Sequence, residues 1–256
     1  MKIPKVLILS LTLVAGCAGG GGDDGNIKTR ATTNDVAETN LDLGIEYMRR
    51  GDYETALEKL DRAYKADPGY YATHNAYGLL YQRLGKPQLA EKHFRRSLSL
   101  NGNDSLTRNN YGLFLCQNRR YDEAEEQFLK AANNPLYETP AVALANAGSC
   151  AKDAGHLDKA ERYFRRALKI DPKIPTALKQ MSQLSYEQGN YLSARAYLQR
   201  FLENARHTPE TLWLGIRIER KLGDKDAESS YGLMLRNNYP DSEEAALYKS
   251  SRNGSQ

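Results

Sequence analysis

The four histidines are the residues best suited to acid–base or metal chemistry, and their spacing favours neither. They are scattered along the chain as His74, His93, His156 and His207. None forms a His-Glu-x-x-His motif, which would place two metal ligands and a general base on one helical face. Neither a Gly-x-Ser-x-Gly motif nor a phosphate-binding loop is present. We therefore expect a protein that is not an enzyme and that has no metal, no cofactor and no small-molecule substrate.

The N-terminal residues predict a cleaved export signal. Lys2 and Lys5 precede an apolar run, 6–15, which is too short to span a bilayer as a helix and is typical of a signal peptide. The run leads into Leu-Val-Ala-Gly before Cys17, and this pattern resembles a bacterial lipobox. The resemblance implies that residues 1–16 are removed and that Cys17 is acylated, giving a lipid anchor in a membrane. An ordinary cleaved signal, with the cysteine incidental, is the alternative.

The residues after Cys17 predict where the protein is sorted and how it is attached. Ala18 follows the cysteine; in lipoproteins of this kind an aspartate there tends to retain the protein at the inner membrane. The resemblance therefore implies a lipid-anchored protein of the outer membrane that faces the periplasm. Residues 17–36 are polar and glycine-rich, so we expect a lipidated N-terminus followed by a flexible tether.

Three series of residues recur with a period of about 34 residues. The first is glycine, at spacings of 34, 34 and 36: Gly44, Gly78, Gly112 and Gly148. The second is alanine: Ala56, Ala90, Ala124, Ala160 and Ala194. The third is a large apolar residue four positions after each alanine: Leu60, Phe94, Phe128, Phe164 and Leu198. A small residue on one helix and a large one on the next predict closely packed helical hairpins.

This pattern of recurring residues resembles the tetratricopeptide repeat. The resemblance implies an all-α, right-handed superhelical solenoid of six helical hairpins. The expected units are 37–70, 71–104, 105–140, 141–174, 175–208 and 209–242. The third unit carries two extra residues, which predict an extended loop within 133–140. In the sixth, Gly223 and Pro240 keep register but Glu228 occupies the small-residue position, as expected for a degenerate capping repeat. Residues 243–256 are expected to form a C-terminal tail.

The charge balance disfavours nucleic acid as a partner. The chain has 36 Lys and Arg against 32 Asp and Glu, and removal of Lys2 and Lys5 lowers its net charge of +4 by two. The remaining charges of both signs are interleaved, whereas nucleic-acid-binding domains carry basic patches. We expect protein partners.

The first helix of each repeat is expected to line a concave, partner-binding groove. On this register its residues are Leu41, Ile45 and Met48 in the first unit, Asn75, Leu79 and Gln82 in the second, and Asn109, Leu113 and Cys116 in the third. An apolar surface in the first unit would mark an interaction site. The alternative is that the N-terminal arm, from about Thr33, folds back and covers it. Trp213 is a second candidate anchor, although packing against the penultimate repeat also explains it.

Cys116 and Cys150 are the two cysteines that remain once Cys17 is acylated. They fall at similar places in the first helices of neighbouring units, so a disulfide in an oxidising compartment is one reading. Two separate, buried, small side chains are the other.

A lipobox, a glycine-rich tether and six tetratricopeptide units together resemble the PilF/PilW family, the pilotin lipoproteins of type IV pilus biogenesis. The resemblance implies binding to the secretin, the multimeric outer-membrane channel through which the pilus emerges, and promotion of its localisation and multimerisation. It also implies that early repeats make the contact, which maps onto Leu41, Ile45 and Met48. A lipoprotein scaffold that organises peptidoglycan-remodelling or other envelope-assembly proteins is the alternative.

Overall fold

The computed structural model describes residues 33–253, and within this range it contains helices and no strand. Cys17, the expected signal peptide and most of the expected tether lie outside the described residues. The helices are α1 (Thr33–Arg50), α2 (Tyr53–Ala66), α3 (Tyr71–Arg83), α4 (Pro87–Leu100), α5 (Ser105–Gln117), α6 (Tyr121–Ala132), α7 (Pro140–Asp153), α8 (Leu157–Ile170), α9 (Pro175–Glu187), α10 (Tyr191–Leu202), α11 (Pro209–Leu222), α12 (Lys225–Asn238) and α13 (Glu243–Asn253).

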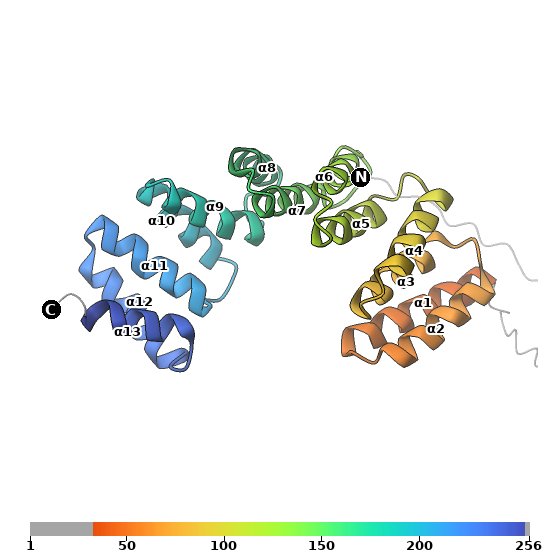
Figure 1. Cartoon of the computed structure of the whole chain (residues 1–256), viewed down its shortest axis with the longest axis horizontal. Helices are drawn as coiled ribbons and strands as arrows, with labels where there is room; N and C mark the ends of the chain where they lie inside the picture. The colour runs from red at the N-terminus through yellow and green to blue at the C-terminus, as the bar shows by residue number, and fades with distance from the viewer. Residues whose placement is uncertain (1–32, 254–256) are drawn as a thin grey trace, which may run out of the picture.

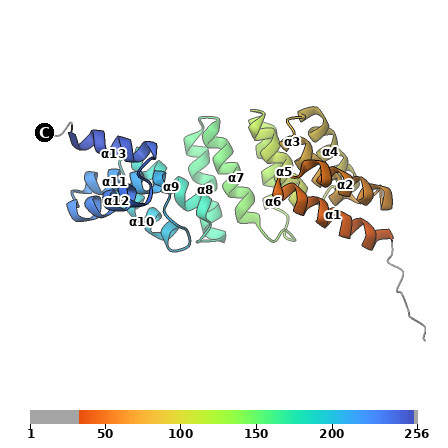
Figure 2. The same cartoon turned by 90° about the horizontal axis from the view of Figure 1, so that it is seen from below.

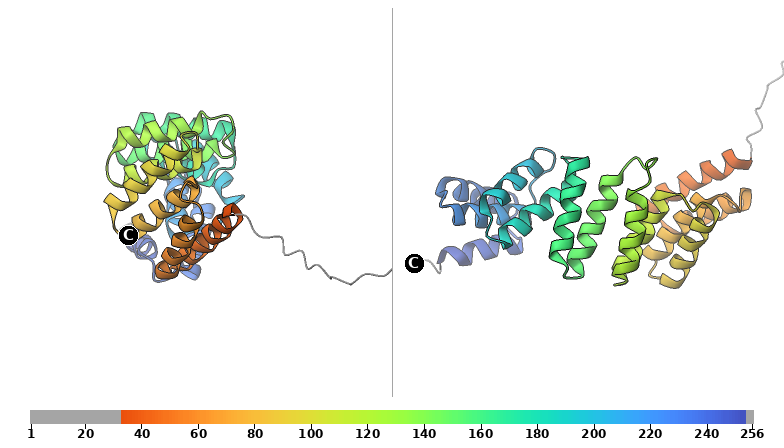
Figure 3. Two further views of the ribbon diagram at one scale, coloured as in Figure 1. Left: turned by 90° about the vertical axis from the view of Figure 1, so that its right-hand side faces the viewer. Right: turned by 90° about the horizontal axis from the view of Figure 1, so that it is seen from above.

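Successive helices pair as antiparallel hairpins, and the hairpins stack in chain order into an arc (Figure 1). The first helix of each hairpin also packs against the first helix of the next, as α3 does with α5 and α5 with α7. In Figure 1, α5 and α7 lie toward the inside of the arc and α6 and α8 toward its outside. Figure 3 shows the same pairs following one another along the long axis. The expected all-α solenoid is confirmed.

The glycine and phenylalanine series form the contact between the two helices of each hairpin. A Cβ atom added to Gly78 would lie 2.6 Å from the ring of Phe94. The same substitution at Gly148 would bring Cβ within 2.6 Å of the Phe164 ring. Both rings are fully buried and pack directly on the backbones of these glycines. A side chain larger than hydrogen would therefore displace the ring, which explains why glycine stands at these positions. In the fifth hairpin Ser182 replaces the glycine and donates a buried hydrogen bond to the carbonyl of Ala194.

The tight turn inside each of the six hairpins contains a residue in the left-handed conformation. Glycine supplies it at Gly51, Gly85, Gly155, Gly189 and Gly223, with φ between 66° and 82°. In the third hairpin the equivalent residue is Arg119, with φ of 61°. A side chain with a Cβ is strained in this region by roughly 1 kcal/mol, so the third hairpin carries a local cost that the others avoid.

The sixth hairpin is one residue out of the expected register, and the assignment of its small-residue position to Glu228 is wrong. Gly215 takes the place of the series glycine, and a Cβ atom added to it would lie 3.0 Å from the ring of Tyr231. Ala227 therefore stands where the alanine series predicts a small residue. The sequence between the fifth and sixth alanines is one residue shorter than the period, which the later glycine and proline concealed.

The expectation of a C-terminal tail at 243–256 is also wrong, because Glu243–Asn253 form the helix α13. This helix packs on α11 and α12, as Figure 2 shows, and buries Ala245 and Tyr248. It covers Leu212 and Ile216 of α11, which would otherwise leave the last hairpin with an exposed apolar face.

At the other end, residues 33–36, expected in the tether, form the first turn of α1. An arm that begins near Thr33 and folds back over the first repeat is therefore not seen in the described residues.

Candidate functional site: the concave face

The first helices of the hairpins line the inside of the arc, but two of the expected groove residues are not accessible there. Leu41 and Met48 are buried, with exposed fractions of 6% and 3%. They belong to a core cluster that includes Tyr77 and Leu80 of α3, because α1 packs against α3 as well as against α2. The expectation that both side chains offer an apolar surface to a partner is therefore wrong.

Two further groove residues are used inside the solenoid. Asn75 and Asn109 are buried, and each accepts a hydrogen bond from an asparagine on the next first helix. Asn110 Nδ2 lies 3.1 Å from Asn75 Oδ1, and Asn146 Nδ2 lies 2.9 Å from Asn109 Oδ1. These carboxamide pairs join α3 to α5 and α5 to α7, so we assign them to holding neighbouring repeats in register.

Three of the other expected residues form what we call the apolar row: Ile45, Leu79 and Leu113. They occupy equivalent positions of α1, α3 and α5, at a spacing of 34 residues, and each is half-buried. Leu79 packs against the core clusters of both the first and the central repeats. The same positions of the next two hairpins hold Ser149 and Gln183, so the apolar character ends at the third repeat. Of the last two expected residues, Gln82 donates a hydrogen bond to Gln117 Oε1 at 2.6 Å and Cys116 forms the disulfide described below.

The apolar row is followed by a covalent link between repeats. Cys116 of α5 and Cys150 of α7 form a disulfide, with their Cα atoms 5.8 Å apart. It ties the first helices of the third and fourth hairpins together near their C-terminal ends, whereas the longest loop of the described chain leads into the N-terminal end of α7. The reading of two separate thiols is excluded by this geometry, and the link holds fixed the junction at which the concave face changes from apolar to polar.

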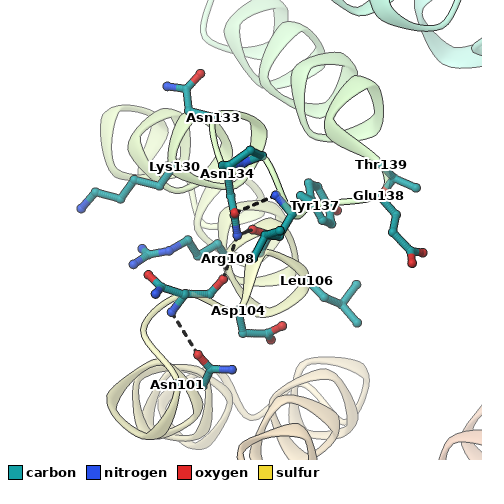
Figure 4. Close-up of a pocket in the computed structure, with 14 residues that line it drawn as sticks. Asn101, Asp104, Leu106, Arg108, Lys130, Asn133, Asn134, Tyr137, Glu138 and Thr139 are labelled. Atoms are coloured by element: carbon teal, nitrogen blue, oxygen red, sulfur yellow. Dashed lines mark hydrogen bonds between the residues drawn. The ribbon is translucent and has the colours of Figure 1, made fainter.

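That longest loop, residues 133–139, contains the two extra residues of the third unit and walls an open hollow of about 1010 Å³. Figure 4 shows Asn134 at its centre. Asn134 Nδ2 donates to the carbonyl of Asn103 at 3.1 Å and to Ser105 Oγ at 2.8 Å, so the loop is pinned to the preceding inter-repeat turn. Leu106 and Leu136 are 54% and 88% exposed, and they add apolar surface to the lining of this hollow.

A second hollow, of about 510 Å³, lies at the junction of the first two hairpins. His74 and His93 meet in its wall, with their Nδ1 atoms 3.0 Å apart in a hydrogen bond in which one ring donates and the other accepts. His74 Nε2 is buried and has no hydrogen-bond partner. At the next junction the equivalent residues are Arg108 and Gln127, which bond directly across the same space at 2.9 Å.

Burial holds both imidazoles in the neutral form. It lowers the pKa of His93 to about 4, with the positive charges of a protonated His74 and of Lys92 adding to the effect. Burial likewise lowers the pKa of His74, helped by Arg96. The expectation that these histidines are isolated is wrong, because His74 and His93 lie on different helices and spacing along one helix does not reveal their contact. Their positions in the repeat could have predicted the contact, because the residues 34 positions later, Arg108 and Gln127, also contact each other.

This pair predicts a loss of stability in acid. A histidine whose pKa is lower in the folded than in the unfolded state contributes stability above the unfolded value near 6.5, and loses it as the pH falls toward the folded value. We expect the free energy of unfolding to fall by about 2 kcal/mol between pH 7 and pH 4.5 because of this pair, after allowance for solvent screening.

The measurement is urea unfolding across that pH range, comparing wild type with His93→Gln. Partly buried carboxylates such as Glu91 lose stability in the same direction, so the difference between the two proteins isolates the imidazole. Equal slopes for the two proteins would contradict the assignment.

Within residues 33–253 the structure shows no cluster of three or more histidine, cysteine, aspartate and glutamate side chains able to hold a metal ion. No helix in that same range is both long enough and apolar enough to cross a bilayer.

The comparisons with known proteins agree with this architecture. Models of the tetratricopeptide repeat match residues 41–105, 104–173 and 151–211. The type IV pilus assembly protein PilF of Pseudomonas aeruginosa is 29% identical over 253 residues, which cover 98% of this chain and all of that protein.

Two solved structures extend the likeness to the fold. That of Pseudomonas aeruginosa PilF superposes with a TM-score of 0.78 over 86% of this chain and 99% of its own. That of PilW, described as a widely conserved type IV pilus biogenesis factor, is 32% identical and superposes with a TM-score of 0.74 over 84% of this chain and 99% of its own. The chain therefore belongs to the PilF/PilW family of tetratricopeptide-repeat proteins.

Proposed function

We propose that this protein is a pilotin: an outer-membrane lipoprotein of type IV pilus biogenesis that binds secretin subunits and promotes their localisation and multimerisation. The observation that carries the proposal is the similarity to PilF along 98% of the chain, since a likeness limited to the repeats would extend to many unrelated proteins. The lipobox at Cys17 supports the membrane attachment. We assign the protein no catalytic role.

The apolar row is the surface that we propose for the secretin. Ile45, Leu79 and Leu113 lie on α1, α3 and α5, the first helices of the first three hairpins. Half-buried side chains at equivalent positions of successive repeats suit an extended or helical apolar segment, because they can add contact area while the solenoid stays folded. Attachment to the membrane would place this surface near membrane-inserted partners and raise their effective concentration, so a modest affinity would suffice.

Changing Cys17 tests the attachment step. In cells, Cys17→Ser should leave the solenoid folded and reduce the amount of multimeric secretin in the outer-membrane fraction several-fold, because the pilotin can no longer hold its partner there. Ala18→Asp is the matched variant, since it keeps the cysteine and is expected to retain the lipoprotein at the inner membrane.

The readout is fractionation of envelopes, followed by quantification of secretin multimers that survive detergent. Circular dichroism of both purified variants serves as the control for folding. Normal amounts of secretin multimer in the outer membrane of both strains would rule out the pilotin role.

A further inference from the structure

A third hollow, of about 170 Å³, lies between the first helices of the last three hairpins and the start of α13. Its wall includes Lys152 of α7, Lys179 of α9, and Trp213 and Arg217 of α11. It is separate from the apolar row, which ends at the third hairpin. The three cations in this wall are half-buried and come from three successive repeats.

None of these cations forms an ion pair with a carboxylate in the described part of the chain. Lys152 Nζ donates to Gln180 Oε1 at 2.8 Å, and an Arg217 Nη atom lies 3.5 Å from Gln183 Oε1. Arg217 Nε is buried and has no hydrogen-bond partner. Half-buried charges are normally paired, because removing them from water is costly. Arg195 of α10 shows the usual arrangement, since it forms an ion pair with buried Glu219.

The guanidinium of Arg217 is held in a fixed orientation. It lies 4.8 Å from the ring centroid of Tyr186 and 5.8 Å from that of Trp213. Stacking on aromatic faces restrains the plane of the group and leaves its N–H donors available at the edge. A planar, restrained fork of donors matches the two oxygens of a carboxylate.

Two carboxylates also line the hollow, Glu210 at the start of α11 and Glu244 in the first turn of α13. The hydroxyl of Thr208 lowers the pKa of Glu210, and the charge of Lys179 contributes to the lowering, so this carboxylate is charged at neutral pH. The lining of the hollow therefore combines three cations, Lys152, Lys179 and Arg217, with two carboxylates. A lining of both signs suits a single carboxylate better than a long polyanion.

We propose that this hollow binds a carboxylate of an extended partner peptide, with Arg217 and Lys179 holding the carboxylate and an adjacent aromatic side chain lying against Trp213. This is a second recognition site on the concave face, and it goes beyond the proposed contact between the apolar row and the secretin. The carboxylate could belong to an Asp or Glu side chain or to the C-terminus of the partner.

Trp213 is the one tryptophan of the sequence, so its fluorescence reports directly on this hollow. The full-length protein in detergent is titrated with three probes. The acidic probe is acetyl-Gly-Asp-Phe-Asp-Gly-amide, and the neutral probe replaces both aspartates with asparagine. The third, acetyl-Gly-Asn-Phe with a free C-terminus, presents its carboxylate at the chain end.

We expect a saturable change in Trp213 fluorescence with the acidic or the free-C-terminus probe, and binding of the neutral probe at least about tenfold weaker, as loss of charge-assisted hydrogen bonds implies. Whichever carboxylate probe binds more tightly identifies the source of the carboxylate. Equal binding of all three probes, or no saturable change with any of them, would overturn the proposal.

The matched variants are Arg217→Gln and Arg162→Gln, the second being an exposed arginine of α8 outside the hollow. Arg217→Gln should weaken the carboxylate probe about tenfold, whereas Arg162→Gln should leave its binding within about twofold. If Arg217→Gln melts at a lower temperature than wild type, Lys179→Gln takes its place with the same expectation. Equal weakening by the control would show general charge attraction and would overturn the assignment to this hollow.

Discussion

Replacing Phe128 with alanine should lower the free energy of unfolding by about 3–5 kcal/mol. The ring is fully buried in the central cluster, between α5 and α6. Its removal loses the transfer free energy of the ring and leaves a cavity that the neighbouring helices cannot close. For a chain of this size we expect the melting temperature to fall by roughly 10 °C.

The contact between Phe128 and Gly112 gives this prediction a sharper form. A Cβ atom at Gly112 would lie 2.7 Å from the Phe128 ring, so Gly112→Ala alone should destabilise the protein. In the Phe128→Ala background the same methyl group enters the cavity and should cost less, or even stabilise. A double-mutant cycle by urea unfolding should therefore show strong coupling between the two positions, of about 1–3 kcal/mol.

Leu136→Ala is the control, because this side chain is 88% exposed and its loss should change stability by less than about 0.5 kcal/mol. Additive effects at residues 112 and 128 would contradict the packing that we describe for the hairpins.

The second large effect should come from the disulfide. Reduction of Cys116–Cys150 should lower the free energy of unfolding by about 3–4 kcal/mol, because the link closes a loop and restricts the unfolded chain. The two cysteines are separated by 34 residues of sequence. The closed segment includes the irregular connection at 133–139.

Denaturant unfolding with and without a thiol reductant measures this difference. The double variant Cys116→Ser with Cys150→Ser should match the reduced wild type and should show no response to reductant. Identical stability of the wild type under both conditions would mean that the disulfide is absent or does not constrain the unfolded state.

The hairpin packing could be predicted from the sequence because each contact recurs. Gly78 and Phe94, or Gly148 and Phe164, are informative in sequence since the same pair of residue types returns about once per repeat. The packing of the sixth hairpin could not be predicted in this way. Gly215, Ala227 and Tyr231 each stand one residue earlier than the period predicts, while Gly223 and Pro240 stand at the expected positions.

The concave face was harder to predict, because periodicity identifies a helical face but not the depth at which the next helix covers it. Leu41 and Met48 share a face with Ile45, yet α3 buries the first two and leaves the third half-exposed. The helix α13 was missed for a related reason. Its apolar residues are few, and its stability comes from covering α11 rather than from its own sequence.

The same distinction applies to the charged residues. Arg217 does not stand out in the sequence, and its significance comes from two aromatic rings on different repeats that hold it without a carboxylate partner. Spacing along the chain cannot reveal such a group, because it depends on the side chains that the neighbouring repeats bring to it. The concave face therefore combines an apolar half, formed by repeats one to three, with a polar half formed by the later ones.

Recovery of the secretin on the tagged protein from solubilised envelopes tests the central claim most directly. We compare wild type with Ile45→Glu combined with Leu79→Glu, which adds charge to the apolar row and leaves the buried Leu41 and Met48 intact. The control combines Leu136→Glu with Leu192→Glu, which charges two exposed leucines outside the row, 88% and 71% exposed.

We predict that wild type and the control recover the secretin, and that the apolar-row variant recovers at least about tenfold less while it melts as wild type does. Recovery of peptidoglycan-remodelling proteins in place of the secretin, or equal recovery of the secretin by all three folded proteins, would contradict the account.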